Sequence, residues 1–170
     1  MAFTCTALAS SAHVDGFRRD GDGFAISVHV GYDAEKGANY VLVVGLSPAP
    51  PGNLEFYFAI VEVFGDGDEV TIFDAKVINA FVPRQDRAAI RKVLLQAARG
   101  LVDWAKPVCF FMATHADFLP EKALVKFYLL LEVFRSCGMH VSEPNTYHGR
   151  HMWWAERVAT IDVESDSNST

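Results

Sequence analysis

The first half of the chain carries hydrophobic patterns that are typical of β-strands. Residues 24–31 alternate apolar and polar side chains, and this period of two predicts a half-buried strand. Residues 40–46 are continuously apolar, as expected of a strand that is covered on both faces. Residues 54–64 form the next predicted strand, and the following Gly-Asp-Gly-Asp favours a tight turn. Residues 69–82 then pair back, so we predict an antiparallel meander of four strands.

After Pro83 the hydrophobic spacing changes to that of a helix. Apolar residues three and four positions apart predict one buried helical face: Ile90, Val93, Leu94, Ala97, Leu101 and Trp104. Residues 108–113 are fully apolar and predict a short strand. Because this strand follows a helix, we expect it to be central or parallel to a neighbour.

A second helix and a hairpin complete the predicted fold. Pro120 suits the first turn of the helix, Lys122 and Lys126 are expected to face solvent, and Gly138 is placed for a left-handed C-cap. Residues 139–142 and 150–161 predict the hairpin. The order β-β-β-β-α-β-α-β-β indicates an α+β fold with a mostly antiparallel sheet of about six to seven strands and two main helices.

No linker or internal repeat divides the chain. We therefore predict a single domain over residues 1–162, with an irregular N-terminal arm at 1–22 and a flexible polar tail at 163–170.

Composition and charge exclude several classes of function. The chain has 170 residues and a net charge of −6, which disfavours nucleic-acid binding and docking to anionic membranes. No apolar run approaches the roughly 18 residues of a membrane span, and the N-terminus lacks the basic region of a signal peptide. Three irregularly spaced cysteines give no disulfide framework, so we expect a reduced, cytoplasmic protein. The pair His148 and His151 matches no strong metal-binding signature, and we predict no metal site.

Three arginines after Pro83 form the best functional cluster in the sequence. Arg84, Arg87 and Arg91 are spaced by three and four, which places them along one side of the first helical turn. A solvated helix face is the simpler interpretation of such residues. However, positive charge at a helix N-terminus opposes the helix dipole, and this misfit favours a bound anion.

Three residues are candidate general bases. His115 follows the strand at 108–113, at the carboxyl end where open α/β sheets bind ligands. Asp117 could orient His115 or cap the next helix. Glu55 and Glu62, on the strand at 54–64, are the other candidates.

The element order and two local motifs resemble the GNAT superfamily of N-acetyltransferases. Phe134-Arg-Ser-Cys-Gly-Met139 is similar to the Tyr-x-x-x-Gly-Phe with which that family ends its last helix, and the passage from Val82 to Leu95 is similar to its pyrophosphate loop. The resemblance covers roughly residues 54–158. It implies acetyl-CoA as the acetyl donor. Its pyrophosphate would be held by the arginines and by the backbone amides of Ala88, Ala89 and Ile90.

Two functions stay open at this point. In the first, the protein binds acyl-CoA and transfers an acetyl group to a small-molecule or protein amine. In the second, a catalytically inactive fold of the same kind binds a protein partner, either as a regulatory module or as a homodimer. The alanines that replace the loop glycines and the Phe134 that replaces the tyrosine favour the second function, whereas the arginines favour the first.

Overall fold

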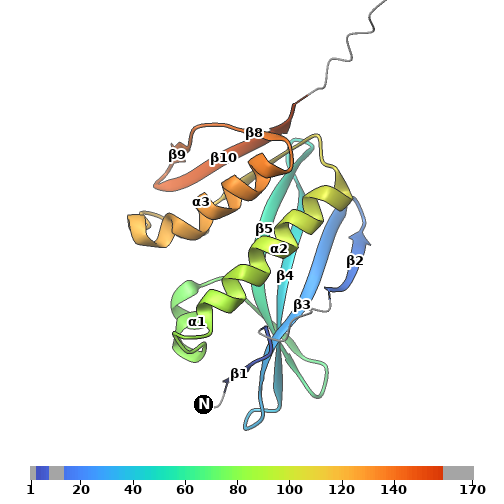
Figure 1. Cartoon of the computed structure of the whole chain (residues 1–170), viewed down its shortest axis with the longest axis vertical. Helices are drawn as coiled ribbons and strands as arrows, with labels where there is room; N and C mark the ends of the chain where they lie inside the picture. The colour runs from blue at the N-terminus through green and yellow to red at the C-terminus, as the bar shows by residue number, and fades with distance from the viewer. Residues whose placement is uncertain (1–2, 8–13, 159–170) are drawn as a thin grey trace, which may run out of the picture.

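A computed structural model describes residues 3–7 and 14–158 of the chain (Figure 1). Within them the fold is α+β, as predicted, with three helices and one large, mostly antiparallel sheet. The sheet has ten strands, which is more than the six to seven expected. The elements are β1 (Phe3–Cys5), β2 (Val14–Asp20), β3 (Gly23–Asp33), β4 (Ala38–Ala49), β5 (Asn53–Phe64), β6 (Glu69–Ile72), α1 (Ala75–Phe81), α2 (Arg87–Ala105), β7 (Cys109–Ala113), α3 (Glu121–Ser136), β8 (Met139–Val141), β9 (Asn145–Tyr147) and β10 (Arg150–Arg157).

The predicted meander is present, and the N-terminal region adds to it. Strands β3, β4, β5 and β6 pair consecutively and antiparallel. The interpretation of residues 1–22 as an irregular arm was wrong where the structure describes them, because β1 and β2 both pair with β3. The packing of Phe3 helps to explain the position of β1, since its ring centroid lies 5.4 Å from that of Tyr40 and 5.9 Å from that of Phe81. The tail predicted at 163–170 lies outside the described residues.

The prediction of one strand over residues 69–82 was wrong in its second half. The strand ends at Ile72, and α1 begins at Ala75 after the N-cap residue Asp74. Asp74 Oδ1 accepts a hydrogen bond of 2.7 Å from the backbone N–H of Lys76, which is the bond that starts many helices. No residue of α1 is fully buried, so the helix lies on the surface beside the sheet.

Strand β5 joins two parts of the sheet. One of its edges pairs with β4 along its whole length. The other edge pairs in parallel with β7 only at Glu55–Phe111 and Phe56–Met112, and then in antiparallel with β6 at residues 60–63. The sheet continues from β7 to β10 and β8. The predicted central position of the 108–113 strand, parallel to one neighbour, is therefore confirmed.

Helices α2 and α3 lie on the same face of the sheet (Figure 1). The predicted buried face of α2 is confirmed from Val93 to Leu101. Trp104 is different, because it is 42% exposed and packs against the rings of Phe17 and Phe24 at 4.8 and 5.5 Å. Gly138, directly after the α3 C-cap residue, has a φ of 79°, as predicted for a left-handed cap. No helix in the described residues is both long and apolar enough to cross a bilayer.

Candidate functional site

A cavity of about 400 Å³ lies between the N-terminal halves of α2 and α3. Its apolar lining includes Phe58 and Ile60 on β5, Leu94 on α2 and Ile78 on α1. This is the region where β5 has left β7 and pairs with β6 instead, and α1 together with Phe73, which follows β6, supplies one wall. The volume lies within the usual range of small-molecule sites, about 300–1,000 Å³.

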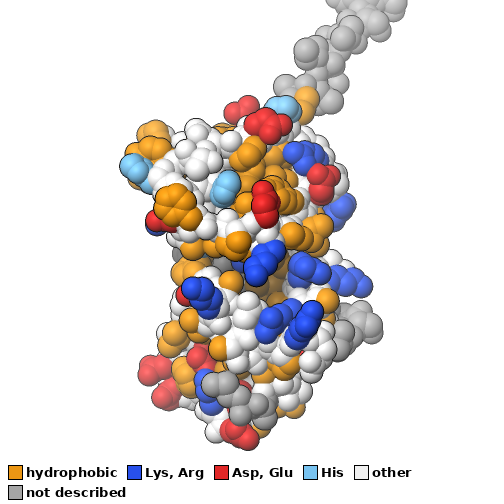
Figure 2. Space-filling view, turned by 90° about the vertical axis from the view of Figure 1, so that its left-hand side faces the viewer, with side chains coloured by type: hydrophobic (Ala, Val, Ile, Leu, Met, Phe, Trp, Pro, Cys, Tyr) orange, Lys and Arg blue, Asp and Glu red, His pale blue; other side chains and the backbone are white. Residues whose placement is uncertain are grey.

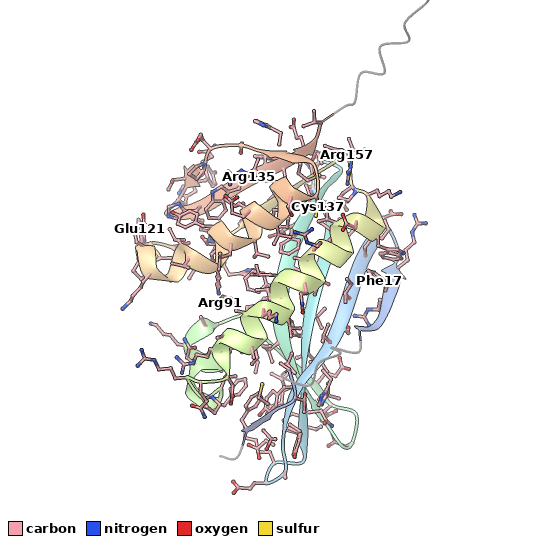
Figure 3. The ribbon with its side chains drawn as sticks, in the orientation of Figure 1. Phe17, Arg91, Glu121, Arg135, Cys137 and Arg157 are labelled. Atoms are coloured by element: carbon pink, nitrogen blue, oxygen red, sulfur yellow. The ribbon has the colours of Figure 1, made fainter. Side chains whose placement is uncertain are left out.

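Four basic side chains surround this cavity. Arg87 and Arg91 come from α2, and Lys122 and Lys126 come from α3. No Asp or Glu is among the described residues that line it. Figure 2 shows Lys and Arg side chains around a hollow with a hydrophobic interior, and Figure 3 places Arg91 on α2 and Glu121 at the start of α3. Such a basic pocket with an apolar interior suits an anionic ligand that also has an apolar part. We call it the basic pocket.

Lys126 has a different environment from the other three cations. Its Nζ lies 5.0 Å from the ring centroid of Phe58 and 5.2 Å from that of Phe127, within the range of cation–π contacts. Burial lowers the pKa of Lys126, because the charged form is poorly solvated there. Among the described residues no carboxylate forms a salt bridge with it. The expectation that Lys126 faces solvent was therefore wrong.

The structure divides the residues predicted to bind the cofactor. Ile90 and Arg91 line the basic pocket, whereas Arg84, Ala88 and Ala89 do not. The N-cap residue of α2, Asp86, makes no side-chain capping bond, which leaves the first amides of α2 without that partner.

Arg87 also lines the pocket, but its guanidinium has a structural task. Its Nε donates to the Val82 carbonyl oxygen at 3.1 Å, and one terminal nitrogen donates to that of Asn79 at 2.9 Å. These bonds hold the C-terminal end of α1 against the start of α2. The three predicted arginines thus separate into one pocket cation, one bracing residue that reaches the pocket, and one residue outside it.

The predicted bases lie in three separate places. His115 is exposed, and its ring centroid lies 4.7 Å from that of Phe73, a side chain that lines the basic pocket. Asp117 neither orients His115 nor caps α3: it pairs with Arg150 at 2.7 Å, and the N-cap residue is Pro120. His115 therefore lies at the pocket margin, and no carboxylate in the described part of the chain forms a hydrogen bond that would orient it.

Glu62 and Glu55 do not line the pocket. Glu62 is buried, accepts a hydrogen bond of 2.9 Å from the Tyr40 hydroxyl and pairs with Lys36 at 3.3 Å. Burial and the hydrogen bond to Glu62 together raise the pKa of Tyr40. Glu55 precedes the buried Phe56, so strand alternation places its side chain on the opposite face of the sheet from Phe56 and Phe58.

Sequence reasoning missed the contributions of Lys122, Lys126 and Phe58. The lysines are more than 30 positions from Arg91, and only the packing of α3 beside α2 brings them together. Their spacing of four was a usable signal, since it places both on one side of α3. No group of three or more metal-ligating side chains occurs among the residues that the structure describes.

The comparisons with known proteins add no relative. No protein-family model, curated protein or solved structure matched the chain.

Proposed function

We propose that this protein binds an acyl-CoA in the basic pocket and transfers the acyl group to an amine. The observation that carries the proposal is the combination of four cations and an apolar interior, with no acidic lining residue among those described. The phosphates of CoA would lie against Arg91 and Lys122, which are exposed at the pocket margin. The acyl and pantetheine parts would contact Phe58, Ile60 and Leu94.

Two further features support this assignment of the ligand. The pocket lies at the N-terminal ends of two helices, where the helix dipole favours negative charge. It also lies on β5, which pairs in parallel with β7 after a connection through β6, α1 and α2.

For the transfer step, His115 is the candidate base. It contacts the pocket-lining Phe73 from outside, so an amine that approaches from that side would meet the imidazole first. The base takes a proton from the ammonium, the amine nitrogen attacks the thioester carbonyl, and the thiol of CoA leaves. Phe134 has no part in this step, because it is buried in the core with 1% of its surface exposed.

A second function, ligand binding without catalysis, is favoured by the positions of three residues. Glu62 and Phe134 occupy structural positions, and Asp117 is paired with Arg150 instead of His115. In this alternative the protein would respond to acyl-CoA as a binding module and would pass the signal to a protein partner.

Calorimetric titration with CoA tests the binding. A ligand at a hundred times its dissociation constant adds about 2.7 kcal/mol of stability, so a thermal shift should accompany the heat signal. Arg91→Ala should weaken binding by roughly ten- to a hundredfold, which corresponds to the loss of one charge-assisted hydrogen bond of about 1.5–3 kcal/mol. Lys92→Ala is the matched control, since Lys92 is exposed on the same helix and does not line the pocket. The absence of both a heat signal and a thermal shift at millimolar CoA would refute the proposal.

A thiol-release assay separates the two functions. With acetyl-CoA and an amine, the wild-type protein should release free thiol, and His115→Gln should bind CoA equally well but release thiol more slowly. Binding by both proteins without any amine-dependent thiol release would favour the binding module.

A further inference from the structure

Lys126 is the pocket side chain whose surroundings suit a nucleophile. It follows Lys122 by one helical turn, but it is partly buried whereas Lys122 is exposed. Its Nζ lies over the rings of Phe58 and Phe127, which are carried by β5 and α3. The amine therefore lies at the apolar surface of the basic pocket, which it lines.

The apolar surroundings of Lys126 favour its neutral form. The other charged lining residues are Arg87 and Arg91 on α2 and Lys122 on α3, and all are positive. The described lining residues of β4, β5 and α1 contribute no ionisable group. Burial lowers the pKa of Lys126, so a larger fraction of its amine is unprotonated at neutral pH than for an exposed lysine. A desolvated lysine of this kind is a recognised way to obtain a nucleophilic amine.

We propose that Lys126 Nζ is itself an acyl acceptor, which takes the acyl group from the acyl-CoA bound in the basic pocket. This inference rests on the proposed function, because the pocket must first hold the thioester. The neutral amine attacks the thioester carbonyl carbon, the new C–N bond forms, and the C–S bond breaks. One proton passes from the nitrogen to the departing thiolate, which leaves an amide on Lys126 and free CoA.

The product would change the pocket that made it. An acylated lysine has no positive charge, so the pocket would keep three of its four cations. The acyl group would also lie against the rings of Phe58 and Phe127, which are in contact with each other. Acylation would therefore weaken the binding of the next anionic ligand and make the site sensitive to the previous supply of acyl-CoA.

Intact-mass spectrometry and peptide mapping test this proposal. The purified full chain is incubated with acetyl-CoA, and the expected result is one added acetyl group on the peptide that contains Lys126. The rate should saturate with acetyl-CoA, rise with pH, and fall when CoA is added as a competitor. Lys126→Arg keeps the positive charge but removes the nucleophile, so it should lose the modification. Lys92→Arg is the matched control, since Lys92 is exposed and does not line the pocket, and it should still be acetylated at Lys126.

The outcomes separate the two proposals. If CoA binds but acetylation is absent, or spreads over exposed lysines in linear proportion to acetyl-CoA, the acceptor role is refuted and the proposed function stands. If CoA does not bind, both proposals fail together. The competition by CoA uses the wild-type protein, so the test does not depend on the folding of a variant.

Discussion

Substitutions at Phe134 test whether the closest match to the N-acetyltransferase motif is a core position. Phe134 is 1% exposed, and its ring makes edge-to-face contacts with Phe56 at 5.0 Å and Phe110 at 4.9 Å. Phe134→Ala should cost about 3–5 kcal/mol of the free energy of unfolding, because the cavity cannot fully collapse. Phe134→Leu keeps an apolar side chain but loses both ring contacts, at about 0.5–1.5 kcal/mol each, so we expect about 1–3 kcal/mol.

Phe134→Tyr is the most informative member of the series. It introduces the tyrosine that the N-acetyltransferase motif has at this position, but here the hydroxyl would enter a packed interior. A buried hydroxyl without a partner costs about 1–3 kcal/mol, so the variant should be less stable than wild type and no more active. Phe118→Tyr is the matched control, since Phe118 is 83% exposed and its new hydroxyl would reach solvent.

Urea denaturation measures the whole series as a shift in midpoint at constant slope. The reasoning is refuted if Phe134→Tyr matches wild type in stability, or if Phe134→Ala loses less than about 1 kcal/mol, which is small for a buried aromatic side chain. Either result would mean that the ring is not enclosed and that the position is open to chemistry.

Two further predictions concern the bracing bonds and the buried hydroxyl. Arg87→Ala should lower the free energy of unfolding by about 1–2 kcal/mol, because the carbonyls of Val82 and Asn79 lose their donors. Arg87→Lys should recover little of this stability. Unchanged stability in both variants would contradict the bracing role. Tyr40 has a raised pKa in the folded protein, so its contribution to stability is complete below the unfolded value of about 10 and is lost as pH rises above it. Wild type should therefore lose stability more steeply above pH ~10 than Tyr40→Phe in denaturation curves, and parallel pH profiles would contradict the assignment.

Local patterns were sufficient for most of the sheet and for the two main helices. The alternation in residues 24–31, the apolar run at 108–113 and Gly138 each act through near neighbours, and the structure has the predicted element at each. The helix α1 was missed because Val77, Ile78 and the residues after them suit a strand. The observed helix has bonds at both ends: Asp74 accepts from the Lys76 amide at its start, and Arg87 donates to the Asn79 carbonyl near its end.

The candidate site was predictable only in part. Arg91 was found because it lies close to the other arginines in the sequence. Lys126 could not be assigned, since its distinctive environment depends on Phe58, which is 68 positions away on β5. Glu62 was named as a candidate base, because the sequence does not reveal that its carboxylate accepts a hydrogen bond from Tyr40 and pairs with Lys36.

The short pairing between β5 and β7 has a mechanical consequence. Where strands share a long hydrogen-bonded ladder, the ladder fixes the angle between them. Here the parallel ladder has only two residue pairs, so the angle between the two parts of the sheet depends largely on the packed rings of Phe56, Phe110 and Phe134. A change in ring volume at this junction would open or close the space beside it. The width of the basic pocket, and with it the size of the ligand that fits, should therefore depend on core positions that do not line the pocket.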